Sequence, residues 1–184
     1  MKTVVRMGSI CAVLLAVTMA APAASAADKA DLRSNTPIAT MDVKGVQVDE
    51  RATEETKQVI AAEPAVAAAA ANVCGSGYTI SVRAARYGTY ATAYTWTNGK
   101  TTGDSYNDKP ICAVLFNDTG VAHYMGIRLK DNYTSTPDVQ DFGTYSTYAG
   151  PVYQNKGYCG VAYSYMKVGS NVVVDNNLTV GACN

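Results

Sequence analysis

The pattern of hydrophobic and polar positions changes once along the chain, near residue 73. Beyond that point apolar and polar residues alternate, as in GYTISVR at 77–83 and VAHYMGIRLK at 121–130. Such alternation is typical of strands that bury one face. The continuous apolar run ICAVLF at 111–116 is typical of a central strand. The C-terminal part of the chain is therefore predicted to form a series of short strands.

Turn residues separate the predicted strands. Asn98-Gly99 follows the alternating stretch 89–97 and favours a tight hairpin turn. NDTG at 117–120 predicts a hairpin between the strands on either side of it. Further strand candidates lie at 150–154, 158–168, 171–175 and 177–183. Without a helical period after residue 73, the pattern predicts an all-β fold, a small antiparallel β-sandwich or barrel of seven to eight short strands.

The phase of the alternation predicts which side chains are buried. His123 shares a face with Met125 and Ile127 and is expected in the core. Tyr124, on the opposite face of the same strand, is expected to be exposed. Tyr163 shares a face with apolar residues of its own strand and is expected to lie inside.

Residues 1–26 have the features of a secretory signal peptide. Lys2 and Arg6 precede an apolar stretch, and ASA at 24–26 is a small-x-small cleavage site. The apolar stretch is shorter than the roughly 18 residues of a membrane span, and no later segment approaches that length. The mature protein is therefore predicted to be secreted, with no membrane attachment after cleavage.

Residues 27–72 differ in composition from the rest of the chain. They begin with polar residues and end in an alanine-rich run, with few large apolar side chains. Alanine and the acidic residues near Glu54 favour a helix, but an isolated helix with little to bury is marginal. This segment is predicted to be a weakly ordered pro-segment or linker, followed by a disulfide-stapled β domain at 73–184.

Four cysteines remain after the signal peptide: Cys74, Cys112, Cys159 and Cys183. An even number of cysteines in an exported chain predicts disulfides. Three pairings are possible, and we prefer Cys74 with Cys112 and Cys159 with Cys183 because these close the shorter loops. The cysteines lack the paired spacing of structural zinc sites, so no metal or other cofactor is expected.

The ionisable residues disfavour several functions. The chain has 15 basic and 15 acidic residues, a balance that does not favour a nucleic-acid partner. After residue 73 it has one histidine, His123, and no glutamate, which excludes catalysis by a glutamate pair or a metal-binding histidine pair. We therefore predict a non-catalytic protein. The alternative is a hydrolase or hydrolase inhibitor that uses His123 or the aspartates Asp104, Asp108, Asp118, Asp131, Asp138, Asp141 and Asp175.

Tyrosine is the strongest compositional signal, and the tyrosines lie after residue 73. Their rings can stack on the apolar faces of sugars, or they can fill the core; the sequence leaves both possibilities open. If a glycan binds, the residues expected to bind it are Tyr124, Tyr145, Tyr148 and Trp96. The stretch FGTYSTYAGPVY at 142–153 is predicted to be a loop that enters a strand, with its rings over the end of the sheet.

Four short motifs resemble segments of one family. They are CGSGY at 74–78, YSTYAGPVY at 145–153, GYCG at 157–160 and GACN at 181–184. They are similar to segments of the spore-associated protein A family, small secreted actinobacterial proteins, and YSTYAGPVY is the most specific. The resemblance implies a protein of the spore or aerial-hypha surface without a defined biochemical activity, and it supplies no catalytic residues. The expected partner is a cell-wall or spore-surface polymer.

Overall fold

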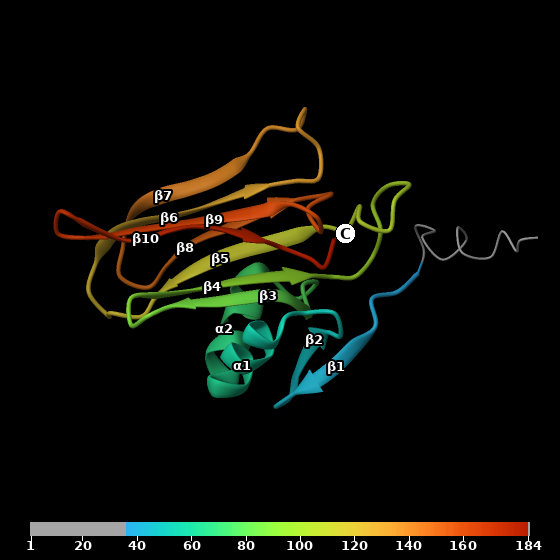
Figure 1. Ribbon diagram of the computed structural model, residues 1–184, viewed down its shortest axis with the longest axis horizontal. Coiled ribbons are helices and arrows are strands. Elements are labelled where there is room, and N and C mark those ends of the chain that lie inside the picture. The colour runs from blue at the N-terminus through green and yellow to red at the C-terminus, as the bar shows by residue number, and fades with distance from the viewer. Residues whose placement is uncertain (1–35, 184) are drawn as a thin grey trace, which may run out of the picture. The chain divides into compact units, whose positions relative to one another are not determined.

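The structure, a computed structural model, describes residues 36–183. The predicted signal peptide at 1–26 and residues 27–35 lie outside the described residues. Within 36–183 the chain forms ten strands in two sheets and two short helices (Figure 1). The predicted all-β sandwich is confirmed, and the two sheets do not close into a barrel.

The larger sheet, which we call the six-stranded sheet, has the order β1-β2-β3-β4-β5-β8. Its neighbouring strands are antiparallel except β2 and β3, which are parallel. The predicted central strand is β5, which pairs with β4 on one side and with β8 on the other. The strands are β1 (Thr40–Val43), β2 (Val46–Asp49), β3 (Ile80–Tyr87), β4 (Ala91–Thr97), β5 (Ile111–Asn117) and β8 (Tyr148–Gln154).

The smaller sheet, which we call the four-stranded sheet, has the order β10-β9-β6-β7 and is antiparallel throughout. The last strand along the chain, β10, has a bulge near Val173. The sequence predicted two separate strands in this region, but the structure has one. The strands are β6 (His123–Lys130), β7 (Val139–Tyr145), β9 (Val161–Val168) and β10 (Asn171–Thr179).

The main core lies between the two sheets. Met125, Ile127 and Leu129 of β6 are fully buried, and they belong to one cluster with Ile111 and Leu115 of β5. Burying each such side chain contributes roughly 1.5–3 kcal/mol. The inner face of the four-stranded sheet is therefore committed to the core, while its outer face remains available to solvent.

The chain crosses between the sheets at two places where the sequence did not predict it. The turn at 117–120 was expected to close a hairpin, but β5 and β6 lie in different sheets. Each of these strands has an apolar face. Because the strands lie in opposite sheets, their apolar faces pack against each other in the core between the sheets. Residues 142–153 are likewise two strands, β7 and β8, in different sheets rather than a loop that enters one strand.

The strands β4 and β5 are paired, but a tight turn does not join them. Gly99 has the positive φ that the sequence predicted, 72°. The chain nevertheless continues into a loop at 98–110 before β5 begins. This loop contributes the buried residue Lys109, and its Tyr106 hydroxyl accepts a hydrogen bond from Arg51, which follows β2.

Two helices cover the second face of the six-stranded sheet (Figure 1). Ile60 and Ala67 of these helices form a second core with Trp96 of the sheet. The sheet supplies the large side chains that the alanine-rich helix lacks. Residues 36–72, which we expected to be weakly ordered, therefore form strands and helices that pack on the β domain; their removal as a pro-segment stays a prediction. The helices are α1 (Glu54–Ala62) and α2 (Pro64–Cys74).

Both preferred disulfides are present. Cys74–Cys112 joins the end of α2 to β5, and Cys159–Cys183 joins the loop before β9 to the C-terminal segment. In the chain-entropy model, closing loops of this size contributes roughly 3–4 kcal/mol each. Within residues 36–183 no helix is long and apolar enough to cross a membrane.

Candidate functional site

The outer face of the four-stranded sheet carries an open depression of about 460 Å³. Strand pairing builds it from three strands, because Gly126 of β6 lies opposite both Phe142 of β7 and Tyr165 of β9. We call this surface the aromatic face. The side chains that line it are Tyr124, Arg128, Gln140, Phe142, Tyr163 and Tyr165.

Gly126 leaves room for the floor of the aromatic face. A Cβ atom at this position would overlap the ring of Phe142. The ring therefore occupies the space above β6 that a side chain at position 126 would fill. Glycine is needed here because another side chain approaches closely.

The rings of the aromatic face form a floor with one wall. Tyr163 lies near-parallel to both Phe142 and Tyr165, with interplanar angles of 29° and 30° and ring centres 6.4 Å apart. Phe142 and Tyr165 are 6.5 Å apart and tilted by 45°. Tyr124 stands edge-on to Tyr165 at 6.3 Å, with an interplanar angle of 78°. Such arrangements of rings are mutually favourable.

Polar groups lie at one end of this floor. The Arg128 guanidinium lies 4.8 Å from the centre of the Tyr163 ring, and its Nε is 3.6 Å from Oδ2 of Asp138. Burial, and then a hydrogen bond to Asp175, raises the pKa of Tyr163 above its usual value. The aromatic face therefore combines apolar ring surface with a cation, a phenol and the amide of Gln140.

Of the four residues predicted to bind a glycan, Tyr124 is the one that lies on the aromatic face, and it is 48% exposed. Trp96 is 1% exposed and packs in the second core. Tyr145 packs against the main core and donates a hydrogen bond to Asp141 at 2.6 Å. Tyr148 packs against the second core. The four residues are not brought together, and the burial of Trp96 removes it from the candidate site.

The sequence pattern did not identify Phe142 of β7, or Tyr163 and Tyr165 of β9, as candidate site residues. Tyr163 was expected inside, but the buried residues of β9 are Ala162, Ser164 and Met166. Tyr163 and Tyr165 therefore point outward. The alternation of side chains along β9 is visible in the sequence, but which set faces the core is not. The pairing with β6 decides it, because Met166 lies opposite the buried Met125.

The residues considered for catalysis have structural surroundings. His123 is half-buried at the start of β6. Asp141 accepts hydrogen bonds from the Tyr145 hydroxyl at 2.6 Å and from the backbone N–H of Gly150 at 2.7 Å. Asp118 accepts one at 2.6 Å from a threonine hydroxyl of β4. In the part of the chain that the structure describes, no three His, Cys, Asp or Glu side chains are grouped so as to hold a metal ion.

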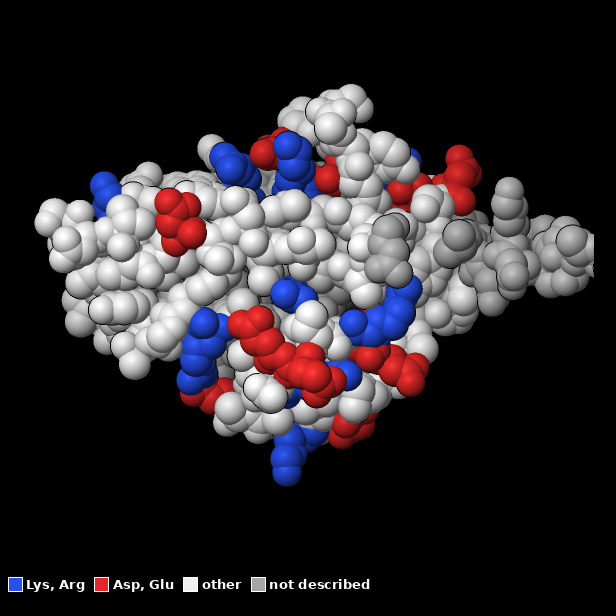
Figure 2. Space-filling model, viewed as in Figure 1, with Lys and Arg blue, Asp and Glu red and all other residues white. Residues whose placement is uncertain are grey.

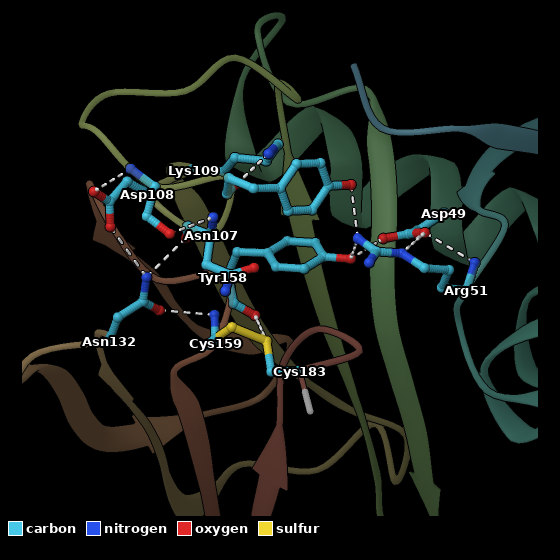
Figure 3. Close-up of a disulfide and its surroundings, with 11 residues drawn as sticks. Asp49, Arg51, Asn107, Asp108, Lys109, Asn132, Tyr158, Cys159 and Cys183 are labelled. Atoms are coloured by element: carbon cyan, nitrogen blue, oxygen red, sulfur yellow. Dashed lines mark hydrogen bonds and ion pairs between the residues drawn. A yellow bond between two sulfur atoms is a disulfide. The ribbon is translucent and has the colours of Figure 1, made fainter. Parts of the chain in front are cut away.

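A polar cluster, buried except for Arg51, joins the N-terminal strands to the rest of the domain (Figure 3). Arg51 donates hydrogen bonds to the hydroxyl groups of Tyr106 at 2.6 Å and Tyr158 at 2.8 Å. Tyr158 in turn donates one to Asp49. Lys109 is fully buried and donates to the carbonyl oxygen of Tyr106. Burial, assisted by the charge of Arg51, lowers the pKa of Lys109 to about 8. Because Lys109 and Tyr158 are inaccessible, we assign this cluster a role in holding the fold.

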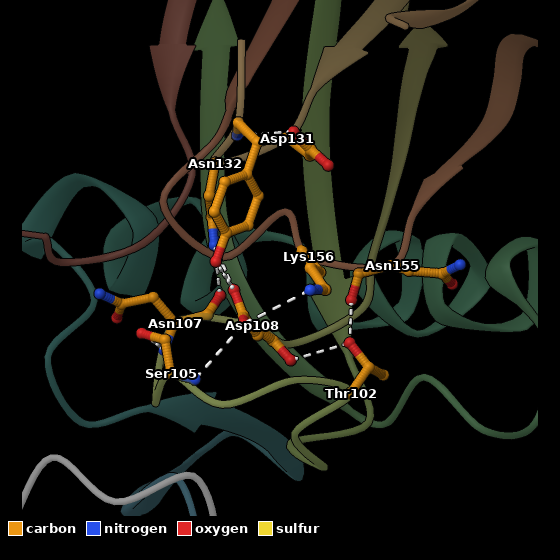
Figure 4. Close-up of polar contacts among 9 residues, drawn as sticks. Thr102, Ser105, Asn107, Asp108, Asp131, Asn132, Asn155 and Lys156 are labelled. Atoms are coloured by element: carbon orange, nitrogen blue, oxygen red, sulfur yellow. Dashed lines mark hydrogen bonds and ion pairs between the residues drawn. The ribbon is translucent and has the colours of Figure 1, made fainter. Parts of the chain in front are cut away.

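Asp108 is the centre of another polar cluster, which organises the loops at one end of the sandwich (Figure 4). Its carboxylate accepts hydrogen bonds from the Tyr133 hydroxyl at 2.8 Å and the backbone N–H of Ser105 at 3.3 Å, and Lys156 lies 3.8 Å away. Burial opposes the charge, but these hydrogen bonds and Lys156 hold the pKa of Asp108 below its usual value. The contacts are internal, so this aspartate is a structural residue.

Charged side chains do not form a patch of one sign on the face shown in Figure 2. Acidic and basic residues are interspersed around the segment that carries α1 and α2, and uncharged residues cover a wide band over the strands. This face therefore lacks the basic stripe that is typical of nucleic-acid-binding proteins.

Comparisons with known proteins do not assign this chain to a family. No family model, no curated protein and no solved structure matches it. A function is therefore to be inferred from the geometry of the aromatic face and from the motifs in the sequence.

Proposed function

We propose that this chain is an exported, non-catalytic module that binds a carbohydrate polymer through the aromatic face. The observation that carries the proposal is the set of neighbouring outward-facing rings, Phe142, Tyr163 and Tyr165, beside the exposed Tyr124. Flat aromatic rings provide apolar surface for the C–H faces of sugars, and phenol groups can bond sugar oxygens. Polar groups such as Gln140 would orient the bound sugar.

The open form of the aromatic face favours a polymer over a small ligand. A site for a small molecule usually encloses most of its ligand, whereas this depression lies on the outer surface of one sheet. Gly126 adds no side chain of its own at the centre of the floor, where the Phe142 ring lies instead. Affinity would then come from several modest contacts along the polymer.

Two features support export. The two disulfides of the domain are of a kind that persists in oxidising compartments. The predicted signal peptide at 1–26 has the same implication.

The proposal predicts that removing two accessible rings weakens binding. The secreted, oxidised chain is tested for retention on insoluble chitin and peptidoglycan, together with the double variant Tyr124→Ala/Tyr165→Ala. Contacts between aromatic rings contribute about 0.5–1.5 kcal/mol each beyond their buried area. With a similar value for each contact between a ring and a sugar, retention by the polymer that binds is expected to fall about tenfold.

The matched control is Tyr90→Ala, since Tyr90 is 38% exposed in the turn between β3 and β4. It removes an accessible tyrosine from the six-stranded sheet, whereas β6 and β9 belong to the four-stranded sheet, and it is expected to leave retention unchanged. Circular dichroism establishes that each variant is folded. If the folded double variant is retained as well as the unchanged chain, the aromatic face is not the binding surface.

A location on the spore or aerial-hypha surface is a further proposal, and the resemblance of YSTYAGPVY at 145–153 supports it. The polymer that the aromatic face binds would then be a component of that surface. Immunodetection in washed spore-wall, vegetative-wall and medium fractions of the producing cells tests the proposal. Enrichment in the spore-wall fraction is expected, and recovery from the medium alone would contradict it.

A further inference from the structure

The outer face of the four-stranded sheet carries more unpaired positive than negative charge. Lys130 follows Arg128 on the outer side of β6, and Lys167 lies on the outer side of β9 because its neighbour Met166 is buried. Of the two carboxylates on this face, Asp138 is paired with Arg128. Asp175 accepts a hydrogen bond from Tyr163 but keeps its charge, so Lys130 and Lys167 outnumber it. Within residues 36–183, neither Lys130 nor Lys167 forms an ion pair.

The two unpaired lysines lie at opposite ends of the aromatic floor. Lys130 pairs with Val161 at one end of β9, and Lys167 is six residues further along the same strand. Six residues of strand span about 20 Å. Tyr163 and Tyr165 lie between the two lysines on the same side of β9. A ligand long enough to cover both rings would therefore meet a cation at each end.

A second depression continues the first toward Lys130. Its volume is about 290 Å³, and it shares Arg128 and Tyr163 with the first depression. The remaining residues that line it are Lys130, Asp138, Val161 and Asn177. Because both depressions are lined by Arg128 and Tyr163, they adjoin on the outer side of β6 and β9 and form one strip.

We infer that the ligand of the aromatic face is an acidic polysaccharide. Its sugar rings stack on Phe142, Tyr163 and Tyr165, and its carboxylates pair with Lys130 and Lys167. This inference rests on the proposed function and adds the chemical class of the polymer. A neutral polymer would use the rings but leave both lysines unpaired, whereas a polyanion gains attraction at both ends of the strip.

Matched pairs of polymers test the inference. The secreted chain is run by affinity electrophoresis against carboxymethyl chitin and neutral glycol chitin, and against polygalacturonate and its carboxyl-reduced form. At least one acidic polymer is expected to bind five-fold or more tightly than its neutral partner. Exposed ion pairs are screened by salt. The preference for the acidic polymer is therefore expected to disappear when the sodium chloride concentration is raised about tenfold, to about 0.5 M.

The double variant Lys130→Gln/Lys167→Gln is expected to lose about five-fold in affinity for the acidic polymer and to bind the neutral one unchanged. The control variant is Lys44→Gln/Lys100→Gln, which removes two exposed lysines outside the four-stranded sheet. It is expected to keep the preference for the acidic polymer.

The outcomes separate this inference from the proposed function. Equal binding of the acidic and neutral members of both pairs overturns the acidic ligand but leaves a glycan-binding module. A preference that survives Lys130→Gln/Lys167→Gln also overturns it. Binding to no polymer, chitin and peptidoglycan included, removes both. Binding to acidic polymers that depends on the lysines but not on Tyr124 and Tyr165 removes the proposed stacking and with it this inference.

Discussion

Lys109 is a buried cation with favourable contacts on more than one side. Its ammonium group lies 3.3 Å from the centre of the Tyr106 ring and donates to a backbone carbonyl, and a desolvated cation over a ring gains about 2 kcal/mol. Burial nevertheless disfavours the charge and is the largest cause that lowers the pKa to about 8, from 10.5 for a free lysine. The side chain therefore loses its proton at lower pH in the folded chain than in the unfolded chain.

This shift predicts that stability rises with pH above about 8. Between about 8 and 10.5 the unfolded chain holds a proton on Lys109 that the folded chain has released, and stability rises with pH wherever the unfolded state binds more protons. Each pKa unit corresponds to about 1.4 kcal/mol, so a rise of about 1–3 kcal/mol is expected. Urea unfolding at pH 7.5, 8.5 and 9.5, which covers roughly the range from below the folded pKa toward the unfolded pKa, measures this rise in the free energy of unfolding.

The control for this prediction is Lys109→Met, which is expected to remove the rise of stability with pH. Tyrosines act in the opposite sense at higher pH, since burial raises the pKa of Tyr94 to about 12 and unfolding lets it ionise near 10. The comparison is therefore made below pH 10. Parallel pH profiles for the two chains would show that Lys109 is charged in the folded state throughout.

At the scale of the element, β9 has two faces with different tasks. Met166 is fully buried against the other sheet, while Tyr165 next to it lies on the aromatic face. The strand thus links the stability of the core to the position of the rings. Substitutions at adjacent positions are expected to separate the two tasks.

We predict that Met166→Ala lowers the free energy of unfolding by about 2–5 kcal/mol, because it leaves a cavity in the core. Tyr165→Ala is expected to cost about 1 kcal/mol or less, since its ring is on the outer face. For polymer binding the order is reversed: Tyr165→Ala is expected to weaken binding more than Met166→Ala does, when the Met166→Ala chain is tested well below its melting temperature. Equal stability losses would mean that the phase of β9 is not as described.

The sequence predicts the positions of the strands well, but it predicts poorly which strands pair with each other. Alternation in 121–130 correctly predicts that Tyr124 is exposed, because β6 has large apolar residues on one face alone. In β9 both faces carry apolar or aromatic residues, so the phase of Tyr163 cannot be read locally. The aromatic face requires the pairing of Gly126 with Phe142 and Tyr165, which is a property of the fold rather than of any one segment.

At the scale of the whole described domain, the segment 36–72 is part of the sandwich. Its helices are weak when considered alone, because alanines offer little surface to bury. They are held by Trp96 of the sheet, by Arg51 through two tyrosine hydroxyls and by the disulfide Cys74–Cys112. The cysteine spacing predicted this disulfide correctly, but the docking of the helices depends on a sheet surface that the segment does not contain.

The central claim is that the outer face of the four-stranded sheet binds a glycan. Its most direct test is an amide NMR titration of the isotope-labelled secreted chain with soluble oligosaccharides from the polymer that retains it best. We predict shift changes that saturate and cluster at Tyr124, Gly126, Phe142, Tyr163 and Tyr165, with none around Arg51. Saturating changes that lie elsewhere in the chain, or no changes at all, would contradict the claim.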